Sequence, residues 1–280
     1  MGAIHTVMPG LQAEGGLKPL TRRHIRTGQF RQAEPGKRRK TTTVGELLTT
    51  IQTGNLPFLL LGECADGLPF LVELGNPDRG AILIGCDRGA GKTHQLQVLA
   101  DSAVRMNAPS EFQVAVITFR PGEWQTWACS PHNKKYLQGI YAWYDPWVST
   151  FIQNLVDLTE ARLDGMQNGP HILFILDDLN FLEELRFETQ VNLHWLLEYG
   201  AQANIWVAGA INAGKAAQFR FWVEPFRTRI IGKTADEENA RILSSRTDSA
   251  ADGLEPGLFR TWTGHGWRTY RLPLLGDVLK

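Results

Sequence analysis

Long hydrophobic runs are absent from this 280-residue chain, although hydrophobic residues make up 43% of it. The two longest apolar segments, "LPFLLLGECADGLPFLVEL" and "HILFILDDLNFL", are interrupted by Glu63 and Asp66 and by Asp177 and Asp178. A membrane-spanning helix needs about 20 apolar residues, so none is expected. No apolar core follows the first basic residue, Lys18, as a signal peptide would require. These absences predict a cytoplasmic protein with no membrane partner.

Cysteine is also scarce in the sequence. Cys64, Cys86 and Cys129 are its only three cysteines, and no two of them form a C-x-x-C pair. An odd number of cysteines without a secretion signal indicates reduced thiols rather than a disulfide framework. A structural zinc site is not expected either, because such sites use four closely spaced Cys or His ligands.

An excess of charge of one sign is missing overall, but the charges are unevenly distributed. The 29 basic and 29 acidic residues cancel, yet residues 1–40 contain nine Lys or Arg and only two Glu. That stretch is also rich in Gly, Pro and Gln, a composition typical of disorder. We therefore predict a basic, disordered arm over residues 1–42 and a folded domain over residues 43–280. The arm's charge indicates an acidic partner.

Short apolar segments alternate with amphipathic ones through the rest of the chain. All-apolar strands between amphipathic helices indicate a mostly parallel sheet covered by helices on both faces, an α/β fold. The closing segment "GLFRTWTGHGWRTYRLP" alternates around Gly264-His265-Gly266 and predicts a hairpin at the sheet edge. Before the alternation, we expect a helix in residues 41–54 and two strands joined at Asp66-Gly67. The other strands are predicted at 81–85, 112–118, 171–176, 204–210 and 228–232, and the other helices at 92–106, 149–166, 188–202 and 236–246.

The segment "GCDRGAGKTHQ", residues 85–95, lies between a predicted strand and a predicted helix. It resembles the phosphate-binding pattern G-x-x-x-x-G-K-[ST], in which backbone N–H groups converge on a phosphate at a helix N-terminus. Small residues let the backbone approach the phosphate, Lys reaches the β- and γ-phosphates, and the hydroxyl of Ser or Thr holds Mg²⁺. The sequence therefore predicts an ATP and Mg²⁺ site formed by Asp87, Arg88, Gly89, Ala90, Gly91, Lys92, Thr93 and His94.

Cys86 stands where the pattern has its first glycine, with Gly85 one position earlier. That glycine serves the turn out of the strand, so we expect an altered entry to the loop and retained phosphate contacts. The alternative is a chance Gly-Lys-Thr turn. The strand before it, the helix after it and the three small residues argue against chance.

Hydrolysis of Mg·ATP needs a carboxylate on the metal side and a group that orients the attacking water. Asp177 ends a buried strand and is the expected metal-side carboxylate, while Asp178 is expected to point toward the γ-phosphate. Asp178 has the alternative role of a helix N-cap. Asn212 ends the next predicted strand and is expected to sense the γ-phosphate or hold the water; its alternative is a turn before Ala213-Gly214.

Taken in order, these segments resemble the FtsK–HerA superfamily of P-loop ATPases over residues 57–273. "NGPHILFILDDL" is similar to the Walker B strand, "YGAQANIWVAGAIN" to the segment ending in A-T-Q, and "FRTRIIGKTADEENARIL" to the P-T-R-I strand and the helix after it. Asp178 replaces the usual Glu and Asn212 the usual Gln. The resemblance implies a RecA-like fold of the additional-strand class and a hexameric, ATP-driven motor on double-stranded DNA.

The resemblance also implies an arginine supplied by a neighbouring subunit. Arg229, at the P-T-R-like position, and Arg227 are the candidates, and Arg246 is the runner-up. The alternative for Arg229 is a surface salt bridge. No barrel, winged helix or membrane segment accompanies the motor, which implies a bare motor domain of the kind found in viral packaging and mobile-element proteins.

Two predicted loops combine cations with aromatic residues and are candidates for contact with DNA phosphates. One contains Lys215 and Arg220, and the other contains Lys134 and Lys135. Each has the alternative of being a solvated loop. The basic arm is expected to bind DNA or a nuclease, capsid or mobile-element partner.

Two functions from different classes follow. The first is an ATP-hydrolysing DNA translocase, and the second is a slow, regulatory ATP-binding protein that recruits a complex through its arm. A small-molecule kinase is a more distant third, because the sequence shows no arginine cluster typical of a kinase lid.

Overall fold

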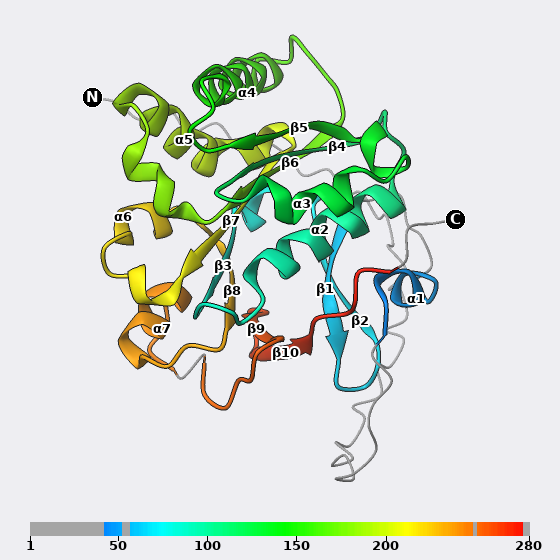
Figure 1. The fold of residues 1–280 in the computed structure, drawn as a ribbon, viewed down its shortest axis with the longest axis vertical. Coiled ribbons are helices and arrows are strands. Elements are labelled where there is room, and N and C mark those ends of the chain that lie inside the picture. The colour runs from blue at the N-terminus through cyan, green and yellow to red at the C-terminus, as the bar shows by residue number, and fades with distance from the viewer. Residues whose placement is uncertain (1–41, 52–56, 249–250, 277–280) are drawn as a thin grey trace, which may run out of the picture. The chain divides into compact units, whose positions relative to one another are not determined.

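A computed structural model describes residues 42–51, 57–248 and 251–276 of the chain (Figure 1). The predicted basic arm, apart from Thr42, lies outside the described residues. Ten strands form one sheet in the order β2-β1-β10-β9-β8-β3-β7-β6-β4-β5. The strands are β1 (Phe58–Cys64), β2 (Pro69–Glu73), β3 (Ile82–Cys86), β4 (Phe112–Thr118), β5 (Leu137–Ala142), β6 (His171–Asp177), β7 (Ile205–Asn212), β8 (Thr228–Gly232), β9 (Leu258–Trp262) and β10 (Trp267–Arg271).

The six strands β8, β3, β7, β6, β4 and β5 run parallel to one another, whereas β9, β10, β1 and β2 pair in antiparallel fashion. The predicted α/β fold with a mostly parallel sheet is therefore confirmed. The predicted closing hairpin is also present as β9–β10, but its placement at the sheet edge was wrong. Strand β9 pairs with β8, and β10 pairs with β1 through Glu63 opposite Arg271 and Cys64 opposite Tyr270. The edges are β2 and β5, because the β1–β2 hairpin extends the sheet past β10.

Seven α-helices and five 3₁₀-helices connect these strands in the described part of the chain. Helix α1 is shorter than predicted and begins with a capping box, in which Thr43 and Glu46 bond each other's backbone N–H. The α-helices are α1 (Val44–Leu48), α2 (Lys92–Met106), α3 (Pro121–Ala128), α4 (Trp147–Leu163), α5 (Phe187–Tyr199), α6 (Arg220–Val223) and α7 (Glu237–Ser244). The 3₁₀-helices are η1 (Pro77–Arg79), η2 (Asn133–Lys135), η3 (Leu179–Glu184), η4 (Gly200–Ala203) and η5 (Ala213–Lys215).

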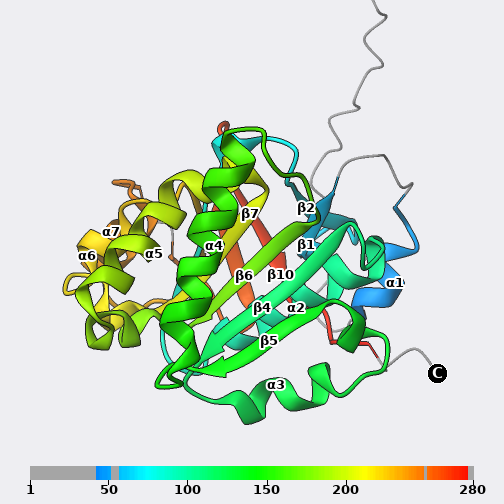
Figure 2. The ribbon, with the colours of Figure 1, turned by 90° about the horizontal axis from the view of Figure 1, so that it is seen from above.

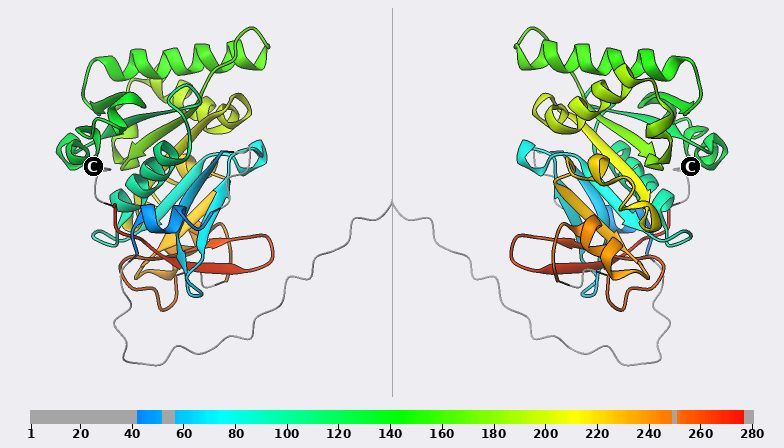
Figure 3. Two further views of the ribbon diagram at one scale, coloured as in Figure 1. Left: turned by 90° about the vertical axis from the view of Figure 1, so that its right-hand side faces the viewer. Right: turned by 90° about the vertical axis from the view of Figure 1, so that its left-hand side faces the viewer.

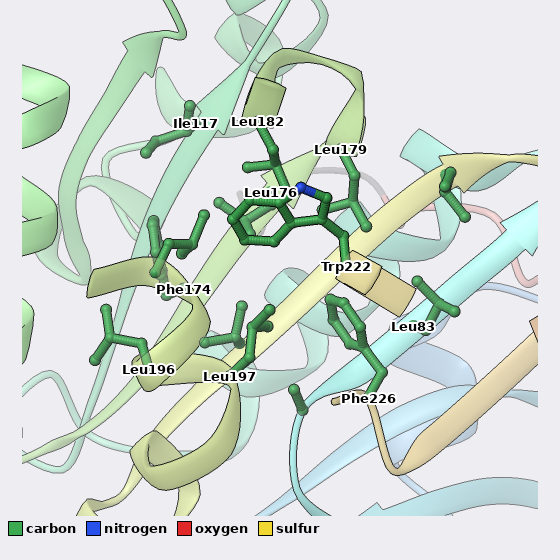
Figure 4. Close-up of a cluster of buried hydrophobic side chains, with 14 of the residues drawn as sticks. Leu83, Ile117, Phe174, Leu176, Leu179, Leu182, Leu196, Leu197, Trp222 and Phe226 are labelled. Carbon is green, nitrogen blue, oxygen red and sulfur yellow. The ribbon is translucent and has the colours of Figure 1, made fainter. Parts of the chain in front are cut away.

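The helices cover both faces of the sheet (Figure 2). Because side chains alternate along a strand, Leu83 of β3 faces one core while Ile82 and Ile84 face the other. The first core lies under α4 to α7, with α4 outermost at the top of both views in Figure 3. Figure 4 shows Trp222 and its neighbours within this core. The second core lies under α2 and α3.

The parallel alignment of the buried, apolar strands brings the polar residues at their carboxyl ends together. The carboxyl ends of the parallel strands β3, β4, β6 and β7 lie side by side, at one end of the sheet along the strand direction. Their last residues are Cys86, Thr118, Asp177 and Asn212.

Among the described residues, no helix combines the length and the apolar character that crossing a membrane would require.

Candidate functional site

A cleft of about 710 Å³ opens at the edge where the parallel strands end. Crevices beyond the carboxyl ends of parallel strands are the usual ligand sites of open α/β sheets. The cleft is lined by Arg88, Gly89, Gly91, Lys92, Thr93, His94, Thr118, Phe119, Arg120, Glu123, Asp177, Asp178, Asn180 and Asn212.

The loop between β3 and α2 forms one wall of this cleft. Gly89 and Gly91 have φ values of +78° and +112°, a backbone region that favours glycine. Gly91 is the residue before the first turn of α2, so the helix N-terminus faces the cleft and suits a bound anion. The Lys92 ammonium donates to the carbonyl oxygens of Cys86 at 3.1 Å and Asp87 at 3.0 Å. It therefore lies across the loop that would receive a phosphate.

Two residues predicted to contact the nucleotide, Asp87 and Ala90, also anchor the loop. The Asp87 N–H donates to Lys233 O, and its carboxylate accepts from the Ala235 N–H at 2.9 Å. Ala90 is buried, and its carbonyl accepts from the Gly257 N–H. The loop is thus held from outside the cleft by the segments that follow β8 and precede β9.

Cys86 fits at the position of the missing glycine because of a glycine on another strand. The Cys86 side chain is fully buried, and burial raises the pKa of its thiol to about 11. A Cβ added to Gly232 would lie 2.9 Å from the Cys86 Cβ. The space for the Cys86 side chain is therefore provided by the absence of a side chain at Gly232.

The buried Asp177 carboxylate lines the cleft and accepts three side-chain hydrogen bonds. The Thr93 hydroxyl donates to Oδ1 at 3.0 Å, while the Trp124 indole N–H and the Thr118 hydroxyl donate to Oδ2 at 2.9 and 3.2 Å. Burial raises the pKa of Asp177, and the three hydrogen bonds oppose that rise. The two predicted metal ligands, Thr93 and Asp177, are thus brought together from positions 84 residues apart.

The oxygen atoms of Thr93 and Asp177 are suitable ligands for Mg²⁺. A hydroxyl and a carboxylate are hard oxygen ligands, and Mg²⁺ is usually bound by one or two such protein groups together with waters and substrate phosphates. The described residues hold no group of three or more His, Cys, Asp or Glu side chains that would suit a metal bound by protein alone.

Asp178 and Asn212 line the cleft and also fulfil their alternative roles. Asp178 has a φ of +85°, uncommon for a residue other than glycine, and its Oδ1 accepts from the Asn180 N–H at 3.1 Å as the N-cap of η3. The Asn212 Oδ1 accepts from the Gly214 N–H at 3.4 Å. Capping and a position at the cleft are therefore compatible for both residues.

One wall of the cleft, formed by the segment that follows β4, was not predicted from the sequence. Thr118, Phe119, Arg120 and Glu123 all line the cleft, and Arg120 pairs with Glu123 at 2.8 Å. One signal was available, since Thr118 ends a predicted strand just as Asp177 does. The contact between Trp124 and Asp177 had no such signal, because it depends on how the unpredicted helix α3 packs.

Arg229 has a role inside its own chain instead of the predicted one. All five of its guanidinium N–H groups donate to backbone carbonyls, which belong to Val223, Glu224, Phe226, Ile242 and Leu243. Burial lowers the pKa of this guanidinium. Its donors hold α6 and α7 at the start of β8, so both the role toward a neighbour's phosphate and the surface salt bridge are replaced by a structural one.

The other two candidate arginines keep more exposure. Arg227 is exposed and directly precedes β8, at the amino end of that strand. Arg246 lies 3.6 Å from the centre of the Trp262 ring and pairs with Asp248 at 3.2 Å. Neither is among the described residues that line the cleft of their own chain.

The two pairs of DNA-contact candidates lie in separate segments of the chain. Lys215 and Arg220 are exposed and follow β7 in the chain; neither lines the cleft, and Arg220 lines a separate cavity with Arg229 and Arg246. Lys134 and Lys135 are exposed and precede the amino end of β5. The structure therefore does not bring the four cations into one surface.

No protein-family model matches the chain, and no curated protein sequence does. Solved structures do match. The cytoplasmic domain of the type VII secretion ATPase EccC from Thermomonospora curvata has 14% identity and a TM-score of 0.68, over 86% of this chain and 33% of that one. ATPases 2 and 3 of EssC from Geobacillus thermodenitrificans have 16% identity and a TM-score of 0.64, over 81% of this chain and 46% of that one.

The conjugation coupling protein TcpA of pCW3, in its monomer form with ATPγS, has 17% identity and a TM-score of 0.60, over 80% of this chain and 68% of that one. The chain thus spans less than half the length of the EccC and EssC chains it matches. At these identities the likeness concerns the fold. With its ten-stranded, mostly parallel sheet and its glycine loop between β3 and α2, this chain has the P-loop ATPase fold that it shares with the EccC, EssC and TcpA structures.

Proposed function

We propose that the chain binds Mg·ATP in the cleft and hydrolyses it to move double-stranded DNA as a ring-shaped homo-oligomer. The observation that carries the proposal is the hydrogen bond of 3.0 Å between Thr93 and Asp177, beside a glycine loop at a helix N-terminus. This is the arrangement that a phosphate loop and a metal-side carboxylate require.

The cleft residues divide the work on ATP among them. The backbone N–H groups of the loop hold the β-phosphate, and Lys92 exchanges its contacts with the Cys86 and Asp87 carbonyls for the β- and γ-phosphates. Thr93 and Asp177 would hold Mg²⁺, which supplies positive charge against the phosphate oxygens. Asp178 and Asn212, at the ends of neighbouring strands, orient the water that attacks the γ-phosphate.

The choice of DNA as the moved polymer rests on the position of positive charge. Lys215 and Arg220 are exposed and follow Asn212 in the chain, Lys215 at the end of the short helix η5 that Asn212 caps, so a change at the γ-phosphate can reach Lys215 through η5. The arm over residues 1–40 adds nine basic residues. Among similar structures, TcpA is described as a conjugation coupling protein and EccC as a secretion ATPase. The positive charge of this chain favours DNA over a polypeptide as the polymer that it moves.

A slow, regulatory ATP-binding protein is the second candidate. The observation in its favour is Asp178, whose shorter carboxylate is engaged as the N-cap of η3. A base held in this way would orient water poorly.

ATP turnover measured with and without duplex DNA separates the two functions. The translocase predicts turnover that DNA stimulates, that Lys92→Ala abolishes and that Lys233→Ala retains, because Lys233 carries the same charge outside the cleft. Turnover that stays slow and indifferent to DNA in the wild-type protein would instead support the regulatory function.

A further inference from the structure

Trp124 is a fully buried residue of α3 that contacts the expected metal-side carboxylate. Its indole N–H donates to Asp177 Oδ2 at 2.9 Å, and its side chain packs in the second core. We propose that Trp124 is a positioning residue that restricts Asp177 to a single free oxygen and thereby makes the site selective for Mg²⁺. This inference rests on the proposed function, since it concerns the same ATP site.

The two oxygens of Asp177 have different surroundings. Oδ2 accepts from both Trp124 and Thr118, whereas Oδ1 accepts, among the residues the structure describes, only from Thr93, the other expected metal ligand. An indole N–H can donate but never accept, so the Trp124 contact always consumes acceptor capacity on Oδ2. Oδ1 is therefore the oxygen left for the cation.

The position of Trp124 is fixed by more than its own hydrogen bond. The Gln97 amide of α2 donates to the Glu123 carbonyl at 2.8 Å, which ties the first turn of α3 to the helix that begins with Lys92. The Trp124 and Trp127 rings meet edge to face with centroids 6.0 Å apart. Trp124 is thus held rigidly against both α2 and the end of β6.

A single free oxygen favours Mg²⁺ over Ca²⁺. Mg²⁺ demands near-octahedral geometry and uses few carboxylate oxygens, whereas Ca²⁺ accepts both oxygens of one carboxylate. Residues that orient a metal ligand typically affect metal affinity by about 10–100-fold when they are replaced. Loss of the indole N–H should therefore lower the affinity of the site for Mg²⁺ and reduce its preference for Mg²⁺ over Ca²⁺.

The test measures binding of a fluorescent ADP analogue to the full chain in EDTA and over titrations of Mg²⁺ and of Ca²⁺. Trp124→Phe keeps most of the apolar volume and removes the donor. Trp127→Phe is the matched control, because Trp127 lies one turn later on α3, is also buried and makes no hydrogen bond to Asp177. Thr118→Val removes the other donor to Oδ2 and supports the test should Trp124→Phe fail to fold.

We expect Trp124→Phe to raise the half-saturating Mg²⁺ concentration at least about 10-fold, with unchanged nucleotide affinity in EDTA and a smaller preference for Mg²⁺ over Ca²⁺. Thr118→Val should change both quantities in the same direction. A purely structural role would not alter cation preference, so a Trp124→Phe profile equal to that of Trp127→Phe would overturn the inference. If the wild-type protein bound nucleotide equally with and without Mg²⁺, the proposed function itself would fail.

Discussion

At the scale of single residues, the site consists of side chains that have two tasks each. Asp178 caps η3 and lines the cleft, and its backbone is held at a φ of +85°. Strained backbone of this kind costs about 1–3 kcal/mol and is concentrated at functional sites. The carboxylate charge, not the cap, is the feature that hydrolysis would use.

Asp178→Asn separates these two tasks. Asn tolerates positive φ and keeps a side-chain oxygen for the Asn180 N–H, but it cannot take a proton from water. We expect ATP turnover to fall by about 10²–10⁴-fold, the usual contribution of a general base, with unchanged nucleotide affinity and thermal stability. Turnover close to that of the wild type would show that Asp178 is only a cap.

Arg229 is expected to matter for stability rather than for catalysis. Arg229→Ala would leave five carbonyl groups without their charged donor, and we expect the free energy of unfolding to fall by about 3 kcal/mol or more in urea titrations. Arg227→Ala, at an exposed position two residues earlier, should stay within about 0.5 kcal/mol of the wild type. If Arg229→Ala kept full stability and lost only turnover, the structural role would be wrong.

The residues of the cleft could be predicted where they belong to a recognisable motif or directly follow a predicted strand. Thr93, Asp177 and Asn212 follow from the phosphate-loop pattern and from the rule that parallel strands end at one edge. The hydrogen bonds of the Arg229 guanidinium could not be predicted, because its acceptor carbonyls belong to two segments, residues 223–226 and 242–243, that meet only through tertiary packing.

At the scale of elements, the hairpin β9–β10 joins the two halves of the sheet and contacts α2. The Tyr270 hydroxyl donates to Gln95 Oε1 at 2.9 Å, and the Gln95 amide donates to the Leu61 carbonyl at 3.0 Å. His94 also contacts the Pro273 carbonyl at 2.7 Å. These contacts tie the first turns of α2 to β1 and to the chain after β10.

Tyr270→Phe tests the strength of this connection. Tyr270 and Gln95 are both buried, so the variant leaves Gln95 Oε1 without its donor at an interior site. We expect the free energy of unfolding to fall by about 1–3 kcal/mol. Tyr144→Phe is the control, because Tyr144 is 71% exposed and should change stability little. Equal effects of the two substitutions would contradict the importance of this contact.

The sequence predicted the strands of the hairpin but not its position. Pairing of Glu63 with Arg271 joins residues more than 200 positions apart, and no local pattern encodes such a partner. Helix α3 and strand β5 were missed for a different reason. Both are short, α3 contains Pro121 and Gly122, and β5 is a half-buried edge strand with weak alternation.

At the scale of the whole molecule, one pair of candidate cations follows the strand β7, whose last residue, Asn212, lines the cleft. This pair is Lys215 and Arg220, whereas Lys134 and Lys135 precede the amino end of the edge strand β5. A DNA segment coupled to the γ-phosphate through Asn212 would therefore contact the first pair.

Binding of duplex DNA over a series of salt concentrations tests this choice. The double variant Lys215→Ala/Arg220→Ala should bind more weakly, and the slope of log affinity against log salt should fall by about 1.8, because each phosphate contact contributes about 0.9. Lys134→Ala/Lys135→Ala removes the same charge from the segment before β5 and should keep the wild-type slope. The reverse result would place the DNA at that segment.

The most direct test of the central claim is an experimental structure of the protein with Mg²⁺ and ATPγS. Our account predicts the terminal phosphates within hydrogen-bond distance of the backbone N–H groups of residues 89–93, with Mg²⁺ beside Thr93 and Asp177. An empty cleft at saturating nucleotide, or phosphates bound away from this loop, would contradict it.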